Sequence, residues 1–195
     1  IFDMRGLERA RQILDNVKLL GFEMATKSGI TWAISDLVTP KEKEGIVKSA
    51  EKEIDAIHEQ FNDGLLTEGE RRARVIEVWM RVKSQIDKLV LSALKKDNPV
   101  YQIVDSNARG SWSQPSQMMG MKGLVSNPKG ETMELPIKAS YKEGLSVIEY
   151  FISTHGARKG TTDTALKTAQ AGYLTRRLVD VAQDIIIRED DCRTK

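Results

Sequence analysis

Apolar residues recur at steps of three and four along most of the chain, which is the spacing of an amphipathic α-helix. Residues 3–20 carry one such stripe and predict a helix that ends at Gly21. A β-branched run over residues 30–34 follows a Ser-Gly turn and predicts a short strand.

Residues 39–97 carry two stronger stripes with the rhythm of a coiled-coil seam. Thr39-Pro40 followed by Glu42 predicts a capped helix that starts at Pro40, and Thr67 with Glu70 predicts a second capping box. Because only a short turn separates the two helices, they must pair antiparallel and cover each other's stripe. The first stripe is Ile46, Ala50, Ile54, Ile57 and Phe61, and the second is Val75, Trp79, Val82, Ile86, Leu89 and Ala93. The densely charged outer faces allow a hairpin packed into a domain but favour one that projects into solvent.

The composition changes after Pro99. Residues 107–122 are rich in Gly, Ser, Gln and Met, and a methionine cluster of this kind fills gaps in a core or forms an adaptable surface. A turn signal at residues 127–130 predicts a connection between two short strands, residues 124–125 and 132–137.

The segment from Tyr141 to Asp184 contains no proline and predicts one helix of about 60 Å. Its two ends are apolar and its centre is polar, which is typical of a helix anchored at both ends across a cavity. Gly156, Gly160 and Gly172 lie inside it and either allow close packing or act as bending points. Because each glycine costs about 1 kcal/mol in a helix, bending is the favoured interpretation, with Gly160 and Gly172 as the hinges.

Basic residues in this segment fall in register. Arg158 and Arg176 are 18 residues apart, so they share one helix face about 27 Å apart, and Lys159 and Arg177 repeat the relationship one residue on. Arginines at fixed spacing suit the backbone of a polyanion. The small pair Thr168-Ala169 between them leaves room for a flat base pair.

Composition limits the remaining possibilities. The 195 residues contain 30 Lys plus Arg and 28 Asp plus Glu, so the net charge of +2 excludes bulk electrostatic binding of nucleic acid but not a local basic face. The single cysteine, Cys192, cannot form an internal disulfide and fits a reducing cytosol. No apolar run approaches the roughly 20 residues of a membrane span. We expect a mainly α piece of a longer protein, with a long antiparallel helical hairpin, one very long bridging helix and minor short β-strands.

Residues 150–160, 163–169 and 172–181 resemble the bridge helix of the bacterial RNA polymerase beta-prime subunit, and the resemblance covers essentially the whole chain. It implies a funnel region at 1–38, a rim-helix hairpin at 39–98, a bridge-supporting loop region at 99–140, the bridge helix at 141–184 and the start of a zinc-binding region at 185–195.

The resemblance also implies site residues. Thr168 and Ala169 would lie against the template base pair at the nucleotide-addition site. Four further residues would contact the template DNA or the active site: Lys167, Tyr173, Arg176 and Arg177. Arg109 would face the nucleotide channel, and Cys192 would be one of four zinc ligands whose other three lie outside this chain. Arg193 stands where the family has glycine after that cysteine.

The function that the resemblance implies is that of one part of a DNA-directed RNA polymerase, a nucleotidyltransferase of the cytoplasm and nucleoid that uses magnesium and zinc. Its partners would be the beta, alpha, omega and sigma subunits, template DNA and RNA, nucleoside triphosphates, and regulatory factors that dock on the rim hairpin; no membrane is implied. The aspartate motif that binds magnesium and the trigger loop are absent from these 195 residues, so we expect the chain alone to be inactive. The alternative is a free-standing helical adaptor without a catalytic role.

Overall fold

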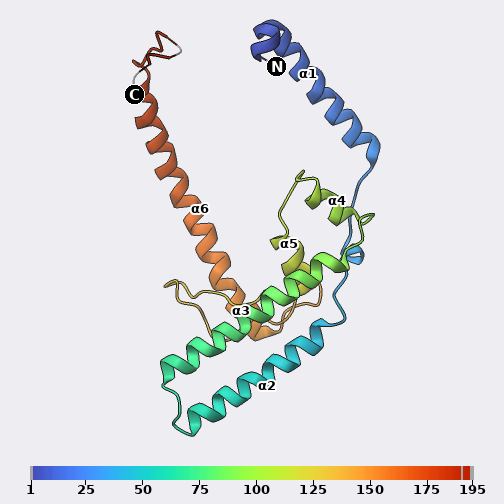
Figure 1. Cartoon of the computed structure of the whole chain (residues 1–195), viewed down its shortest axis with the longest axis vertical. Coiled ribbons are helices and arrows are strands. Elements are labelled where there is room, and N and C mark those ends of the chain that lie inside the picture. The colour runs from blue at the N-terminus through green and yellow to red at the C-terminus, as the bar shows by residue number, and fades with distance from the viewer. Residues whose placement is uncertain (1, 190, 194–195) are drawn as a thin grey trace.

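The computed structural model describes residues 2–189 and 191–193 and is mainly α, as predicted. The helices of this part of the chain are α1 (Phe2–Ser28), α2 (Lys43–Asn62), α3 (Glu68–Ala93), α4 (Pro99–Asp105), α5 (Ser113–Pro115) and α6 (Val147–Ala182). A 3-10 turn, η1 (Ile34–Asp36), and a π-helical turn, η2 (Ser116–Gly120), complete them. Figure 1 shows α2 and α3 as a hairpin at one end, with α1 and α6 extending away from it.

The N-terminal segment differs from the prediction in two ways. Helix α1 is kinked at Gly6 and passes through Gly21 to Ser28, because Gly21 keeps helical geometry and the left-handed Gly29 (φ 57°) follows the last turn instead. The predicted strand at residues 30–34 is absent, and a 3-10 turn begins at Ile34. A strand needs a neighbour for its backbone groups, and here Ile30 and Trp32 are exposed.

The predicted antiparallel hairpin is confirmed as α2 packed on α3. Its seam buries Ala50, Ile54 and Ile57 of α2, and on α3 it buries Val75, Val78, Trp79, Val82, Ile86 and Val90. Toward the end of α3 the buried positions are Ile86, Val90 and Leu94, in place of the predicted Leu89 and Ala93, which are only partly buried.

The two predicted hairpin caps have different outcomes. At α3 the box forms as predicted: Thr67 Oγ1 accepts the Glu70 N–H at 3.3 Å, and Glu70 accepts the Thr67 N–H at 2.9 Å. At α2 the prediction is wrong, since the helix begins at Lys43 and Thr39 makes no cap. Lys43, the first residue of α2, is buried and forms an ion pair with Glu143, 100 residues away.

Residues 116–140 pack along the hairpin, so it is covered on one side and does not simply project into solvent. Met119, Met121 and Ile137 are fully buried, which confirms the methionines as gap fillers in the core. The predicted strands are reduced to two isolated antiparallel bridges, Gly123 with Ile137 and Ser126 with Thr132. Near the hairpin tip, the Arg71 guanidinium donates two hydrogen bonds, of 2.8 and 3.2 Å, to the Glu134 carboxylate.

Helix α6 is the predicted long helix, but it begins at Val147 instead of Tyr141. Gly144 has a φ of 86°, which no helix tolerates, and Ser146 then caps the first turn by accepting the Glu149 N–H at 3.3 Å. The 36 residues correspond to a helix about 54 Å long. Its buried residues among those described are Ile152 and Ser153, both near its start.

Candidate nucleic-acid interface

The distal part of α6 is the candidate interface because it is a regular helix with a free surface. Every residue from 164 to 182 is exposed, and the helix continues unbroken through Gly160 and Gly172. The second apolar anchor that the sequence predicts has no partner among the described residues: Leu174, Leu178 and Val181 are all at least half exposed. Within the described part of the chain, α6 is therefore held near its start, through Ile152 and Ser153 and through Lys159, which donates to the Pro128 carbonyl at 3.4 Å, and its distal half extends away (Figure 1).

The predicted site residues are distributed around α6 in a definite order. At about 100° per residue, Ala169, Tyr173 and Arg176 fall within about 60° of one another and form one stripe. Arg158 joins the same stripe three turns before Ala169. Thr168 and Arg177 flank the stripe on opposite sides, and Lys167 lies behind it. The apolar residues Leu174, Leu178 and Val181 also lie on the face opposite Ala169, so the distal helix has a polar front and an apolar back.

Local contacts hold the polar side chains of the stripe and of the two residues that flank it. The Arg177 guanidinium lies 4.4 Å from the centre of the Tyr173 ring, and Arg176 pairs with Asp180 at 3.8 Å. The hydroxyl of Thr168 donates to the backbone carbonyl of Thr164 at 2.8 Å. Because residues 158–182 contain five basic and two acidic residues, this part of the chain is a local basic surface on a nearly neutral protein.

Arg109 is not brought to this stripe. It lies in the turn between α4 and α5, where Asn107 and Gly110 have positive φ values of 55° and 80°. It lines a small apolar cavity of about 170 Å³ together with residues such as Trp32 and Met118, and none of the lining residues belongs to α6.

Cys192 is exposed and lies beyond the end of α6. Within residues 2–189 and 191–193, no group of three or more His, Cys, Asp or Glu side chains is placed to hold a metal ion. A structural zinc site takes four protein ligands, so Cys192 by itself does not fit the requirement. In the same described residues no helix is both long and apolar enough to cross a membrane.

Sequence reasoning missed the residues that fix the base of α6. Glu149 accepts the backbone N–H groups of Lys138 at 3.0 Å and Ala139 at 3.2 Å, and it also closes the capping box with Ser146. A Ser-x-x-Glu motif at residues 146–149 was the available signal for the cap. The Lys122 ammonium group links the preceding loop to α6 a second time, by donating to the buried hydroxyl of Ser153. No local sequence motif predicts that contact.

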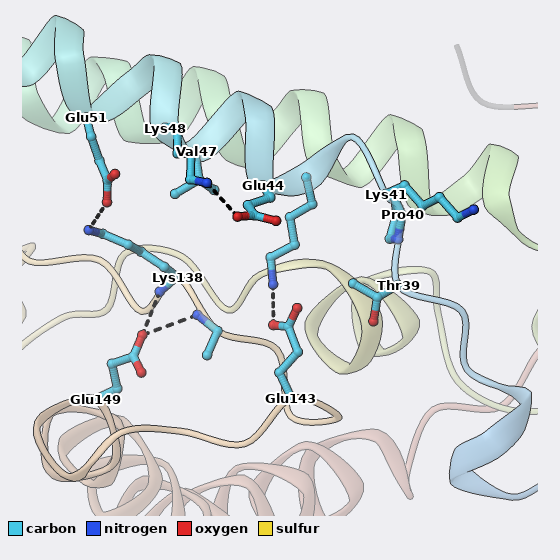
Figure 2. A pocket seen from close by; sticks show the side chains of 12 residues that line it. Thr39, Pro40, Lys41, Glu44, Val47, Lys48, Glu51, Lys138, Glu143 and Glu149 are labelled. Atoms are coloured by element: carbon cyan, nitrogen blue, oxygen red, sulfur yellow. Dashed lines mark hydrogen bonds and ion pairs between the residues drawn. The ribbon is translucent and has the colours of Figure 1, made fainter.

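The charges at this base are tuned by their surroundings (Figure 2). Partial burial works to raise the pKa of Glu149, but hydrogen bonds from Ser146, Ala139 and Lys138 outweigh it and hold the pKa below its ordinary value. At Glu143, too, burial works to raise the pKa, but hydrogen bonds from Lys43 and Ser140 outweigh it and lower the pKa. Both side chains are therefore held as carboxylates at neutral pH.

Comparison with known proteins identifies the family of the chain. The family described as RNA polymerase Rpb1, domain 4, matches residues 48–145, and RNA polymerase Rpb1, domain 5, matches residues 144–195. The chain belongs to the RNA polymerase Rpb1 family. Within the family it is 53% identical over 194 residues to the DNA-directed RNA polymerase subunit beta' of Halalkalibacterium halodurans. It is 48% identical over 193 residues to that of Syntrophomonas wolfei and 52% identical over 194 residues to that of Bacillus thuringiensis.

These matches cover 99–100% of this chain but only 16% of each relative's length. The border between the two family domains falls at residues 144–145, at the left-handed Gly144 just before α6. The family division therefore separates the hairpin and its packed loops from the long helix.

Proposed function

We propose that this chain is the part of a DNA-directed RNA polymerase beta' subunit in which α6 serves as the bridge helix. Thr168 and Ala169 contact the template base pair at the nucleotide-addition site, and Tyr173, Arg176 and Arg177 lie near the template strand. Lys167 starts from the other side of α6, so its long side chain would have to reach around the helix to join them. Bending at Gly160 and Gly172 helps the template to advance by one nucleotide. The observation that carries the proposal is the exposed stripe of Ala169, Tyr173 and Arg176 on an unbroken helix.

Chemistry supports this assignment. Arginines bind phosphate oxygens through paired N–H donors, and an exposed aromatic ring offers a stacking surface. Ala169 lies between Arg158 and Tyr173 on the stripe and presents only a methyl group, so a flat base pair can approach the helix closely there. The apolar back of the helix, with Leu174 and Leu178, would pack against another part of the polymerase.

The hairpin of α2 and α3 would be the rim of the nucleotide-entry channel, with Arg109 facing the entering nucleoside triphosphates. Its tip, residues 59–74, carries an exposed Leu65 and would dock regulatory factors. The chain would work with the beta, alpha, omega and sigma subunits in the cytoplasm at the nucleoid. Magnesium would be held elsewhere in the subunit, and Cys192 would supply one of four zinc ligands. By itself the chain would catalyse no nucleotide transfer.

The test is a matched pair of substitutions in the full subunit within reconstituted polymerase. Ala169→Leu adds bulk to the proposed template face, and Ala157→Leu adds the same bulk at an exposed position of the same helix that lies outside both the stripe and the apolar back. We expect Ala169→Leu to slow single-nucleotide addition at least tenfold more than Ala157→Leu, since small misplacements of reacting groups reduce rates by up to about 100-fold. Equal rates for the two variants would reject the proposal.

A further inference from the structure

A cavity of about 580 Å³ lies between α2 and the base of α6. Figure 2 shows that six of its charged side chains form three pairs. Lys43 pairs with Glu143, Lys48 with Glu44, and Lys138 with Glu51. Because these charges are compensated inside the cavity, it offers little to a charged ligand. Two of the three pairs instead connect α2 with the loop that leads into α6.

Glu149 is the centre of this joint. One carboxylate oxygen accepts the N–H groups of Lys138 and Ala139, and the other accepts the Ser146 N–H at 3.0 Å. A single side chain therefore caps α6 and also binds the loop in front of it.

Lys138 carries the connection on to both helices of the hairpin. Its ammonium group pairs with Glu51 of α2 and lies 5.6 Å from the centre of the Trp79 ring of α3. The backbone of Lys138 is held by Glu149 while its side chain is held by the hairpin. A continuous chain of contacts thus runs from α6 through Glu149 and Lys138 to Glu51.

A small change at this joint is magnified along α6. Ala169 lies 20 residues after Glu149, which is about 30 Å along the helix axis, so a tilt of about 2° at the base moves Ala169 by about 1 Å. Misplacement by about 1 Å is enough to reduce a positioned reaction by as much as about 100-fold.

We propose that Glu149 is a positioning residue that sets the angle at which α6 leaves the hairpin, and that it transmits displacement of the hairpin to the distal stripe through Lys138 and Glu51. This inference rests on the proposed function of α6. It assigns to the hairpin a mechanical influence on nucleotide addition that is separate from any contact with substrate.

The experiment uses the full subunit in reconstituted polymerase and single-nucleotide addition at varied nucleoside triphosphate concentration. Glu149→Ala should lower kcat about tenfold or more and leave KM within about twofold, because α6 is misplaced while nucleotide entry is intact. Glu149→Gln keeps an oxygen acceptor for Lys138 and Ala139 and should recover most of the rate. Lys48→Ala, which removes only the pair with Glu44 on the same cavity wall, is the matched control and should match the unmodified enzyme.

Glu51→Ala breaks the link to α2 and leaves the cap of α6 untouched. It therefore tests the inference even if the Glu149→Ala subunit fails to assemble into polymerase. We expect it to lower kcat by severalfold, and the Glu51→Ala, Glu149→Ala double variant to be no slower than Glu149→Ala, since the two residues act in series. Unchanged kcat in Glu51→Ala, or a Glu149→Gln variant as slow as Glu149→Ala, would overturn the inference. If Ala169→Leu slows addition and Glu51→Ala does not, only the inference falls; if Ala169→Leu has no effect, the proposed function itself falls.

Discussion

The guanidinium of Arg177 lies over the ring of Tyr173, 4.4 Å from the ring centre, on the exposed distal half of α6. The two residues are four apart, so one helical turn brings them together without help from any other element. Tyr173 belongs to the stripe with Ala169, whereas Arg177 flanks it. The contact therefore holds an arginine beside the face that we propose for the template.

Replacing Tyr173 tests this contact. A cation–π contact at an exposed site is worth about 0.5–1 kcal/mol, so Tyr173→Ala should weaken binding of template DNA by the assembled polymerase about two- to fivefold. Tyr173→Phe retains the ring and should bind as the unmodified enzyme does. Binding titrations at several salt concentrations provide the measurement. Equal weakening by both variants would show that the hydroxyl, and not the ring face, is what matters.

Gly172→Ala tests the proposed hinge. Alanine stabilises a helix interior by about 1 kcal/mol relative to glycine, and no atom lies within 4 Å of the added methyl group here, so the variant should stiffen α6 without a clash. We expect an altered elongation rate or altered pausing in the assembled enzyme. Gly21→Ala is the control because it makes the same change in open space on α1. A hinge at Gly172 is contradicted if both variants elongate and pause like the unmodified enzyme.

The hairpin tip is best tested at Glu68, because Glu70 is committed to the cap of α3. Glu68→Lys should weaken docking of regulatory factors and leave basal RNA synthesis nearly unchanged. Thr67→Ala provides the contrast, since losing an N-cap costs about 1 kcal/mol of helix stability without reversing a charge. Factor binding and basal synthesis are measured on the same preparations. Parallel loss of both activities in Glu68→Lys would remove the tip as a docking surface.

Much of the fold is predictable here because it depends on local periodicity. The stripes of α2, α3 and α6 follow from the spacing of apolar residues, and the register of Arg158, Ala169 and Arg176 follows from 3.6 residues per turn. The capping boxes show the limit of local motifs. Thr67 with Glu70 forms one, but the similar residues at Thr39 and Glu42 do not.

The joint at the base of α6 was not predictable from sequence. The pair Lys43–Glu143 joins residues 100 positions apart, and Lys138 and Glu51 are separated by 87. Nothing in the local sequence says which lysine meets which glutamate when both types are abundant. The Thr39-Pro40 motif likewise gives no sign that α2 begins at Lys43, whose partner Glu143 is equally distant.

Gly120 tests the packing of the methionine loop on α3. A methyl group added there would lie 2.9 Å from Ile86 Cγ2 and 3.0 Å from Val90 Cγ2, which is closer than side chains normally approach. Gly120→Ala should therefore lower the free energy of unfolding by about 1–3 kcal/mol in urea titrations of the chain. Adding Val90→Ala makes room for the new methyl group, so the double variant should be more stable than the sum of the two single effects. Strict additivity would contradict the tight contact.

The lowered pKa of Glu149 gives the joint a dependence on pH. Partial burial alone would raise this pKa, but hydrogen bonds from Ser146, Ala139 and Lys138 favour the carboxylate more strongly, so the pKa in the folded chain lies below the ordinary 4.5. A carboxyl group with a lowered pKa contributes stability that is present above its unfolded value and is lost as the pH falls through its folded value. The hydrogen bonds that Glu149 accepts from the loop should therefore be fully formed at neutral pH and weaken only below about pH 4.5.

In a pH titration of the ¹⁵N-labelled chain, the amide signals of Lys138 and Ala139 should shift together with a midpoint below 4.5, and Glu149→Gln should abolish that step. The Ile137 amide, which donates to the Gly123 carbonyl at 2.9 Å, is the internal control and should not follow it. A midpoint at or above 4.5 would mean that these amides do not stabilise the carboxylate, and the joint would then lack its central contact.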